Sequence, residues 1–146
     1  MSDQHQIQRL WLRATPGGAM EEQTTLSLEA GQGVRGDHAF GKKRHVTIVF
    51  VDDWAQAEQE LSLTIDPAGR RANVLVSGGN GGRYIGTTLS LGGAQIEVMG
   101  EIRPCPTMEE AAVGLLEALK PNCRAGIWGR VLNDAEISPG DALAAT

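Results

Sequence analysis

Cys105 is the residue with the clearest chemical potential, and it lies in the segment Arg103-Pro104-Cys105-Pro106-Thr107. Thr107 and Glu110 have the spacing of a capping box, so we expect Thr107 to be a helix N-cap and Cys105 to precede that helix. A thiolate there is stabilised by the positive end of the helix dipole and by the nearby Arg103. The segment therefore predicts a reactive cysteine, although a small buried hydrophobic role stays open.

Cys123 follows the same predicted helix. A helix of about 13 residues is ~20 Å long, whereas a disulfide joins Cα atoms only ~4.4–6.8 Å apart. We therefore expect Cys123 to be a packed or surface thiol, while a two-cysteine mechanism in which Cys123 resolves or pairs with an oxidised Cys105 stays the less favoured alternative. Two cysteines also build neither a disulfide framework nor a four-thiolate metal site, which is typical of a protein of the reducing cytoplasm.

Arginines are abundant in a chain whose formal net charge is −5. The sequence has ten arginines and three lysines, and guanidinium groups suit planar oxyanions such as carboxylate and phosphate. Arg71 and Asn73 lie two residues apart on a predicted strand, so the Asn73 amide is expected at the same anion site as Arg71. Lys42 and Lys43 are instead expected in a solvated loop. The other arginines that can converge on the anion are Arg44, Arg70, Arg103, Arg124 and Arg130.

Several classes of site and partner are not expected. The three histidines have no metal-ligand spacing, and His5 is expected in a disordered terminus, so we predict no zinc site. Residues 78–82 lack the Gly-Lys-Ser/Thr ending of a phosphate-binding P-loop. An acidic chain argues against nucleic-acid binding. No apolar run approaches the ~20 residues of a membrane span and no signal peptide is visible, so we expect a cytoplasmic protein without membrane contact.

The elements that must position these residues are short strands separated by glycine turns. Glycine accounts for 19 of the 146 residues. Helices are predicted from Asp52 or Asp53 to Leu61 and over 107–120, and Gly92-Gly93 marks a hairpin. Strands are predicted over residues 7–13, 24–29, 46–51, 72–77, 88–91, 94–99 and 126–132. This pattern favours a mainly β fold, a barrel or a sandwich with two or three helices, as a single domain over 1–146.

The order of the short motifs resembles the MOSC domain, which is found at the C-terminus of molybdenum cofactor sulfurases and as stand-alone bacterial proteins. The resemblance implies a fold like the pyruvate-kinase β-barrel and a pocket whose cysteine carries sulfur or ligates molybdenum through a pterin cofactor. The matching segments, in chain order, are 31–38, 44–49, 71–78, 91–98, 103–105, 124–132 and 137–141.

On this resemblance Cys105 is the sulfur-carrying or metal-ligating thiolate. The predicted cofactor-binding residues are Arg71, Asn73, Thr47, Arg44, Arg103 and Thr107. Residues 1–146 contain no match to the N-terminal barrel of amidoxime-reducing relatives or to a lysine-bearing aminotransferase-like domain, so no pyridoxal phosphate chemistry is expected on this chain alone. Asp134-Ala135 replaces the more typical glycine at the last turn.

Three functions therefore remain open. The first is a sulfur carrier or molybdenum-cofactor-binding protein, with possible sulfurtransferase-like or cofactor-dependent activity. Its partners would be a sulfur donor or acceptor protein, or a small anionic ligand. The second is a thiol-based redox or detoxifying enzyme that uses Cys105 as an oxidisable nucleophile. The third is a non-catalytic small-molecule binding module.

Overall fold

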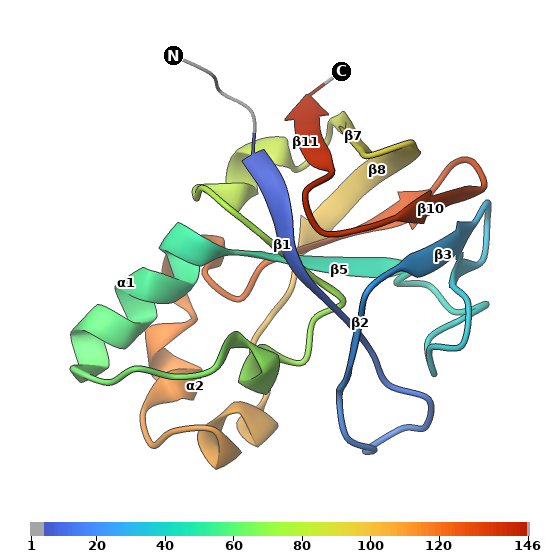
Figure 1. The fold of residues 1–146 in the computed structure, drawn as a ribbon. Helices are drawn as coiled ribbons and strands as arrows, with labels where there is room; N and C mark the ends of the chain where they lie inside the picture. The colour runs from blue at the N-terminus through green and yellow to red at the C-terminus, as the bar shows by residue number, and fades with distance from the viewer. Residues whose placement is uncertain (1–4, 146) are drawn as a thin grey trace.

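Eleven strands form within residues 5–145, the part of the chain that the structure, a computed structural model, describes. Seven of them close into a barrel in the order β11-β7-β8-β9-β5-β6-β1, because β11 pairs with both β7 and β1 (Figure 1). The mainly β, barrel-like fold class is thus confirmed. The strands are β1 (His5–Leu12), β2 (Glu21–Gln23), β3 (Leu26–Glu29), β4 (Gly33–Val34), β5 (Val46–Phe50), β6 (Val74–Val76), β7 (Thr88–Leu91), β8 (Ala94–Glu101), β9 (Ile127–Val131), β10 (Ala135–Ile137) and β11 (Ala142–Ala145).

The helices lie outside the barrel. α1 (Val51–Leu61) follows β5 directly and begins the crossover to β6, which pairs with β5 in parallel. α2 (Leu115–Ala118) lies on the same side of the barrel as α1 (Figure 1). Within residues 5–145, no helix has the length and apolarity that crossing a membrane requires.

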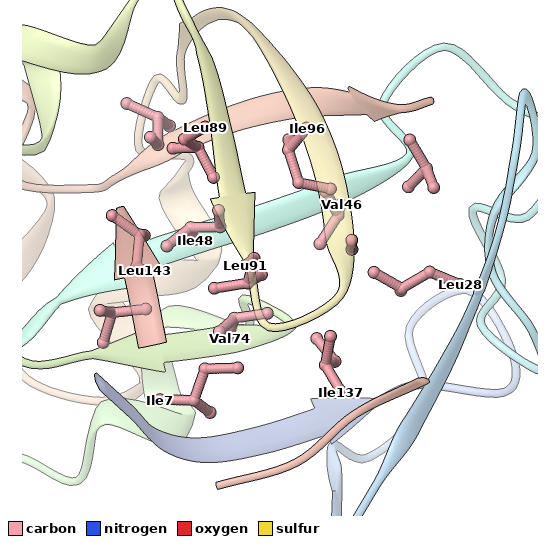
Figure 2. Close-up of a cluster of buried hydrophobic side chains, with 14 of the residues drawn as sticks. Ile7, Leu28, Val46, Ile48, Val74, Leu89, Leu91, Ile96, Ile137 and Leu143 are labelled. Atoms are coloured by element: carbon pink, nitrogen blue, oxygen red, sulfur yellow. The ribbon is translucent and has the colours of Figure 1, made fainter. Parts of the chain in front are cut away.

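The barrel interior is a core of alternating strand residues (Figure 2). Val46 and Ile48 of β5 point inward and are at most 1% exposed, while Thr47 between them belongs to the outer face. Val74 of β6 also points inward, so Asn73 before it lies on the outer face as well. This alternation places Thr47 and Asn73 side by side on the outer wall of the barrel.

A second apolar cluster fills the space between that outer wall and the helices. Val49 of β5 and Leu75 of β6 pack outward against Trp54 of α1 and Leu115 of α2. β5 is therefore apolar on both faces, which explains why its sequence reads as a nearly continuous hydrophobic run. Met108 joins the same cluster, so the segment that carries Cys105 is anchored to the barrel.

The helix predicted over 107–120 is wrong. The chain forms a 3-10 helix η3 (Pro106–Glu110), then α2, and then a second 3-10 helix, η4 (Pro121–Cys123). Gly114 has φ +92° and separates η3 from α2. Thr107 is not an N-cap and no capping box forms; the Glu109 carboxylate instead accepts hydrogen bonds from the backbone N–H groups of Gly114 and Leu116. The apolar spacing thus reflects burial on one face of a broken segment.

Two further expectations differ from the structure. His5 is not in a disordered terminus but begins β1, where its Nε2 lies 2.9 Å from Nη2 of Arg83. Neither Asp52 nor Asp53 caps α1, whose N-cap is Phe50 without a side-chain bond. The Asp53 carboxylate accepts hydrogen bonds from the backbone N–H groups of Asn80 and Gly81. Tertiary contacts to the 78–82 loop therefore outweigh local capping.

Gly126 allows the closest backbone approach in the barrel wall. Its φ is +109°, and a Cβ there would lie 2.2 Å from the Ile48 carbonyl oxygen. Because both the dihedral and the contact are unfavourable, Gly126→Ala should lower the unfolding free energy by about 2 kcal/mol or more, measured by urea denaturation. Gly140→Ala is the control, since φ is +93° there but nothing lies within 4 Å. Equal losses in the two variants would contradict the steric argument.

Candidate functional site

A cavity of about 250 Å³ opens on the outer wall of the barrel. It lies between the ends of β1, β5 and β6 and two covering segments, residues 37–44 and 102–108. The structure places all seven residues of the predicted site along this cavity, from three separate stretches of chain. They are Arg44, Thr47, Arg71, Asn73, Arg103, Cys105 and Thr107. Their roles toward a ligand stay predictions.

Cys105 is exposed at this cavity, so it is not the small buried hydrophobe that the sequence left open. Its Sγ lies 2.7 Å from Oγ1 of Thr107. Burial raises the pKa of the Cys105 thiol, but hydrogen bonds from the Thr107 hydroxyl and backbone, with the charges of Arg70 and Arg71, leave that pKa below its usual value. The expected activation thus has a different cause: local hydrogen bonds and arginines rather than a long helix.

Five arginines line the same cavity: Arg13, Arg44, Arg70, Arg71 and Arg103. Within residues 5–145, none of them forms an ion pair with a carboxylate. Arg124 and Arg130, which were also expected at the anion, are not among the lining residues. Arg124 is instead paired with Glu60 at 2.8 Å. The cavity is therefore strongly cationic in an acidic chain.

Arg70 is the most deeply placed of these cations, at 6% exposed. Its Nε donates to the carbonyl of Ala125. Burial lowers the pKa of Arg70 to about 10, so the side chain is still charged at neutral pH. Arg71 donates from Nη2 to the Gly18 carbonyl at 2.7 Å. Arg44 lies 5.8 Å from the ring centre of Trp128, a cation–π contact at the edge of the cavity.

Asn73 and Thr47 bind each other rather than offering free polar groups. Asn73 Oδ1 accepts hydrogen bonds from the Thr47 backbone N–H and hydroxyl, both at 3.1 Å. Asn73 Nδ2 donates to the Trp11 carbonyl at 3.3 Å and to Asp37 at 3.5 Å. The Asn73 amide thus fixes the wall of the cavity, which leaves the arginines as the main donors for a ligand.

The sequence analysis missed a polar group at the other side of the cavity. Arg13 Nη2 lies 2.6 Å from His38 Nε2, and since a guanidinium always donates, His38 accepts as a neutral ring. Burial and the Arg13 charge lower the pKa of His38 accordingly. The adjacent Asp37 is buried and accepts from the backbone N–H groups of Arg13 and Ala39. Residues 36–38 belong to the glycine-rich motif that the sequence analysis noted, but no spacing in the sequence predicts their contact with Arg13.

Comparison with known proteins shows the family to which this chain belongs. The sequence model of the MOSC domain matches residues 35–144, which is well over half of the chain. This chain belongs to the MOSC domain family. All the lining residues named above except Arg13 fall within the match, and Arg13 and the lining residue Met20 precede it. MOSC domains are associated with the molybdenum cofactor.

Solved structures share the fold of this MOSC protein at low sequence identity. The YuaD protein from Bacillus subtilis has a TM-score of 0.80 and 19% identity, covering 96% of this chain and 94% of its own. YiiM from Geobacillus stearothermophilus has a TM-score of 0.76 and 16% identity, covering 97% and 75%. YiiM from Escherichia coli has a TM-score of 0.69 and 18% identity, covering 97% and 69%. Comparison with curated protein sequences gives no match.

The second thiol of this MOSC protein lies elsewhere. Cys123 is half-buried, unpaired and not among the lining residues of the cavity. Burial raises the pKa of its thiol, and Glu101 adds to the effect. Cys105 and Cys123 therefore differ in the direction of their pKa shifts. No cluster of three or more His, Cys, Asp or Glu side chains suited to a metal ion is present within residues 5–145.

Removing the Thr107 hydroxyl should make the Cys105 thiol less reactive at neutral pH. In Thr107→Val the thiolate loses a hydrogen bond, so the thiol pKa should rise and alkylation by iodoacetamide at neutral pH should slow severalfold. The measurement is the alkylation rate as a function of pH, whose midpoint should move to higher pH. Thr107→Ser keeps the hydroxyl and should retain the original midpoint. An unchanged midpoint in Thr107→Val would show that the Thr107 hydroxyl does not contribute and that the Thr107 backbone N–H and the arginines set the pKa.

Proposed function

We propose that this MOSC protein binds the molybdenum cofactor in the Cys105 cavity, with the Cys105 thiolate as the ligand of the metal. One observation carries the proposal. A thiol with a lowered pKa opens onto a cavity lined by five arginines, none of which pairs with a carboxylate within residues 5–145. The cavity therefore combines one soft ligand with many donors for anionic groups.

The residues present fit this group chemically. Thiolates are good ligands for soft metal chemistry, and arginines bind phosphate and oxo groups through paired N–H donors. Arg13 Nε is buried without a hydrogen-bond partner among the described residues, and the buried Arg70 has no carboxylate beside it. These unsatisfied cationic groups support a bound anion at the site.

Each residue then has a distinct task. Cys105 would hold the metal, Arg70, Arg71 and Arg103 would hold the anionic groups, and Asn73 with Thr47 would fix the wall behind them. When bound, the cofactor supplies the redox chemistry of its metal, while the chain supplies binding, orientation and electrostatics. We assign no zinc or pyridoxal phosphate to the site, and we place the protein in the cytoplasm without a nucleic-acid or membrane partner.

Persulfide carriage is a second candidate function, and the exposure of Cys105 favours it. An exposed sulfur at the mouth of a cavity is within reach of a donor or acceptor protein. A thiolate is also the form that attacks sulfane sulfur, so the lowered pKa of Cys105 serves this function too. A thiol-based redox role would use the same thiolate but would end in sulfenic acid.

The test is to purify the protein from a host that makes the cofactor and from one that cannot. We expect near-stoichiometric molybdenum by elemental analysis in the first preparation and background in the second. Mass spectrometry of the same samples detects Cys105 carrying one additional sulfur atom, which would favour carriage. If neither molybdenum nor additional sulfur is found, the proposal is wrong, and sulfenic acid trapped at Cys105 would support the redox alternative.

A further inference from the structure

We propose that Cys105 takes sulfur from a small sulfane donor whose leaving group is an oxyanion, thiosulfate being the simplest member of that class. The inference rests on the persulfide-carrier form of the proposed function. It adds the chemical class of the donor and the residues that recognise it. The observations that carry it are the charge, the burial and the size of the cavity beside Cys105.

The charge of the cavity calls for a dianion. Five guanidinium groups face one carboxylate, that of Asp37, and the lining residue His38 is a neutral acceptor of Arg13. Even when Cys105 is ionised, an excess of three positive charges remains along the wall. Asp37 accepts hydrogen bonds from the backbone N–H groups of Arg13 and Ala39 and from Asn73, so its oxygens are already engaged. A neutral donor would leave this excess uncompensated.

Three of the five arginines outside the cavity pair with carboxylates, and the other two, Arg83 and Arg130, are exposed to solvent. Arg9 pairs with Glu22 and Asp66, Arg35 with Glu29, and Arg124 with Glu60. Arg70 is 6% exposed, more deeply buried than Arg124 at 7%, yet it has no carboxylate partner within residues 5–145. The Cys105 thiolate is an anionic group whose charge acts on Arg70, but it faces several guanidinium groups at once. Because a buried charge that is not fully compensated is costly, we infer that Arg70 takes a further counterion from outside the chain.

The size of the cavity is sufficient for a small donor. The cavity has about 250 Å³, close to the lower end of the ~300–1,000 Å³ that is typical of drug-sized ligands. The exposed Arg103 and Arg44 stand at its edge beside the exposed Cys105. A compact dianion such as thiosulfate fits this space. Its oxygen atoms can contact guanidinium groups while its sulfane sulfur approaches the Cys105 sulfur.

The chemistry follows from this placement. The Cys105 thiolate attacks the terminal sulfane sulfur of thiosulfate, and a new S–S bond forms on Cys105. The bond between that sulfane sulfur and the sulfonate sulfur breaks, and sulfite leaves with the electron pair. Cys105 ends as a persulfide anion, so atoms and charge balance without an external oxidant or reductant. Guanidinium groups around the leaving sulfite stabilise the charge that develops on it.

The experiment compares two inorganic donors on the reduced protein. Thiosulfate carries an oxyanion leaving group, whereas inorganic polysulfide delivers the same sulfane sulfur and releases a shorter polysulfide or, from hydrogen disulfide, hydrosulfide. The readouts are the mass of the Cys105 peptide and, for thiosulfate, sulfite released per chain. Arg103→Gln removes an exposed guanidinium of the cavity, and Arg130→Gln removes an exposed arginine outside it as the matched control.

We expect both donors to load Cys105 in the unaltered protein, with one sulfite released for each sulfur gained from thiosulfate. Arg103→Gln should slow loading from thiosulfate about tenfold, as for loss of one charged hydrogen bond, while polysulfide loading and the Arg130→Gln variant stay within about twofold. If polysulfide loads Cys105 and thiosulfate does not, the donor class is wrong but carriage stands. If neither donor loads Cys105, the persulfide-carrier function itself is wrong.

Discussion

Replacing Cys105 by alanine should abolish the loading of both molybdenum and persulfide sulfur. The reason is that Cys105 supplies the soft ligand of the cavity, and no cysteine other than Cys105 lines it. Cys105 is exposed, and within residues 5–145 its side chain forms hydrogen bonds only to the exposed Thr107, so the unfolding free energy should change by less than about 0.5 kcal/mol. Elemental analysis, peptide mass spectrometry and urea denaturation measure the three quantities.

Cys123→Ser is the matched control for that variant. Cys123 lies away from the cavity and its thiol pKa is raised, so its removal should leave loading unchanged. Normal loading in Cys105→Ala would refute the central role of Cys105. A large loss of loading in Cys123→Ser would instead revive a mechanism that uses both cysteines.

Replacing Arg70 by methionine should have the second-largest effect, on the retention of an anion. Methionine keeps an apolar stem of similar length but removes the buried charge. Loss of one charge-assisted contact should weaken the retention of molybdenum or the binding of thiosulfate by about 1.5–3 kcal/mol. Because the Arg70 charge also helps to lower the pKa of Cys105, the pH midpoint of thiol alkylation should move upward.

Arg124→Met separates an anion-binding arginine from a structural one. Arg124 is similarly buried, but it pairs with Glu60 and donates to the Ala118 carbonyl. We therefore expect Arg124→Met to lower the unfolding free energy while anion retention and the alkylation midpoint stay unchanged. Arg70→Met should instead weaken anion retention and move the alkylation midpoint upward. Its unfolding free energy should change little, because removing a buried charge that has no carboxylate partner costs little stability. If the two variants lose anion retention equally, Arg70 is not a specific anion contact.

Local rules predicted the elements well where local interactions dominate. The hairpin of β7 and β8 around Gly92-Gly93 forms as expected, because its turn is specified by adjacent residues. The same rules failed at residues 107–120, where the capping-box spacing and apolar periodicity suggested one continuous helix. There Gly114 interrupts the helical backbone, and packing of Met108 and Leu115 against the barrel determines the course of the chain.

The candidate site shows the same division. A resemblance of ordered motifs was enough to name seven residues that the fold brings to one cavity. It did not reveal Arg13 and His38, whose contact joins the end of β1 to a loop 25 positions further along the chain. The spacing of Arg71 and Asn73 suggested that Asn73 offers its amide to the anion, whereas the structure shows that amide bonded to Thr47, Trp11 and Asp37. Such pairings depend on which strands become neighbours.

Residue types and their spacing alone determined the mainly β class, the choice of Cys105 as the candidate reactive residue and the excess of guanidinium groups in this chain. These properties follow from short-range backbone preferences and from the ordinary chemistry of each side chain. Closure of the barrel settled which arginines face Cys105, which ones pair with carboxylates, and how deeply each is buried. Those outcomes depend on contacts between parts of the chain that are distant in sequence. Burial in turn sets the strength of the interactions between the charged groups.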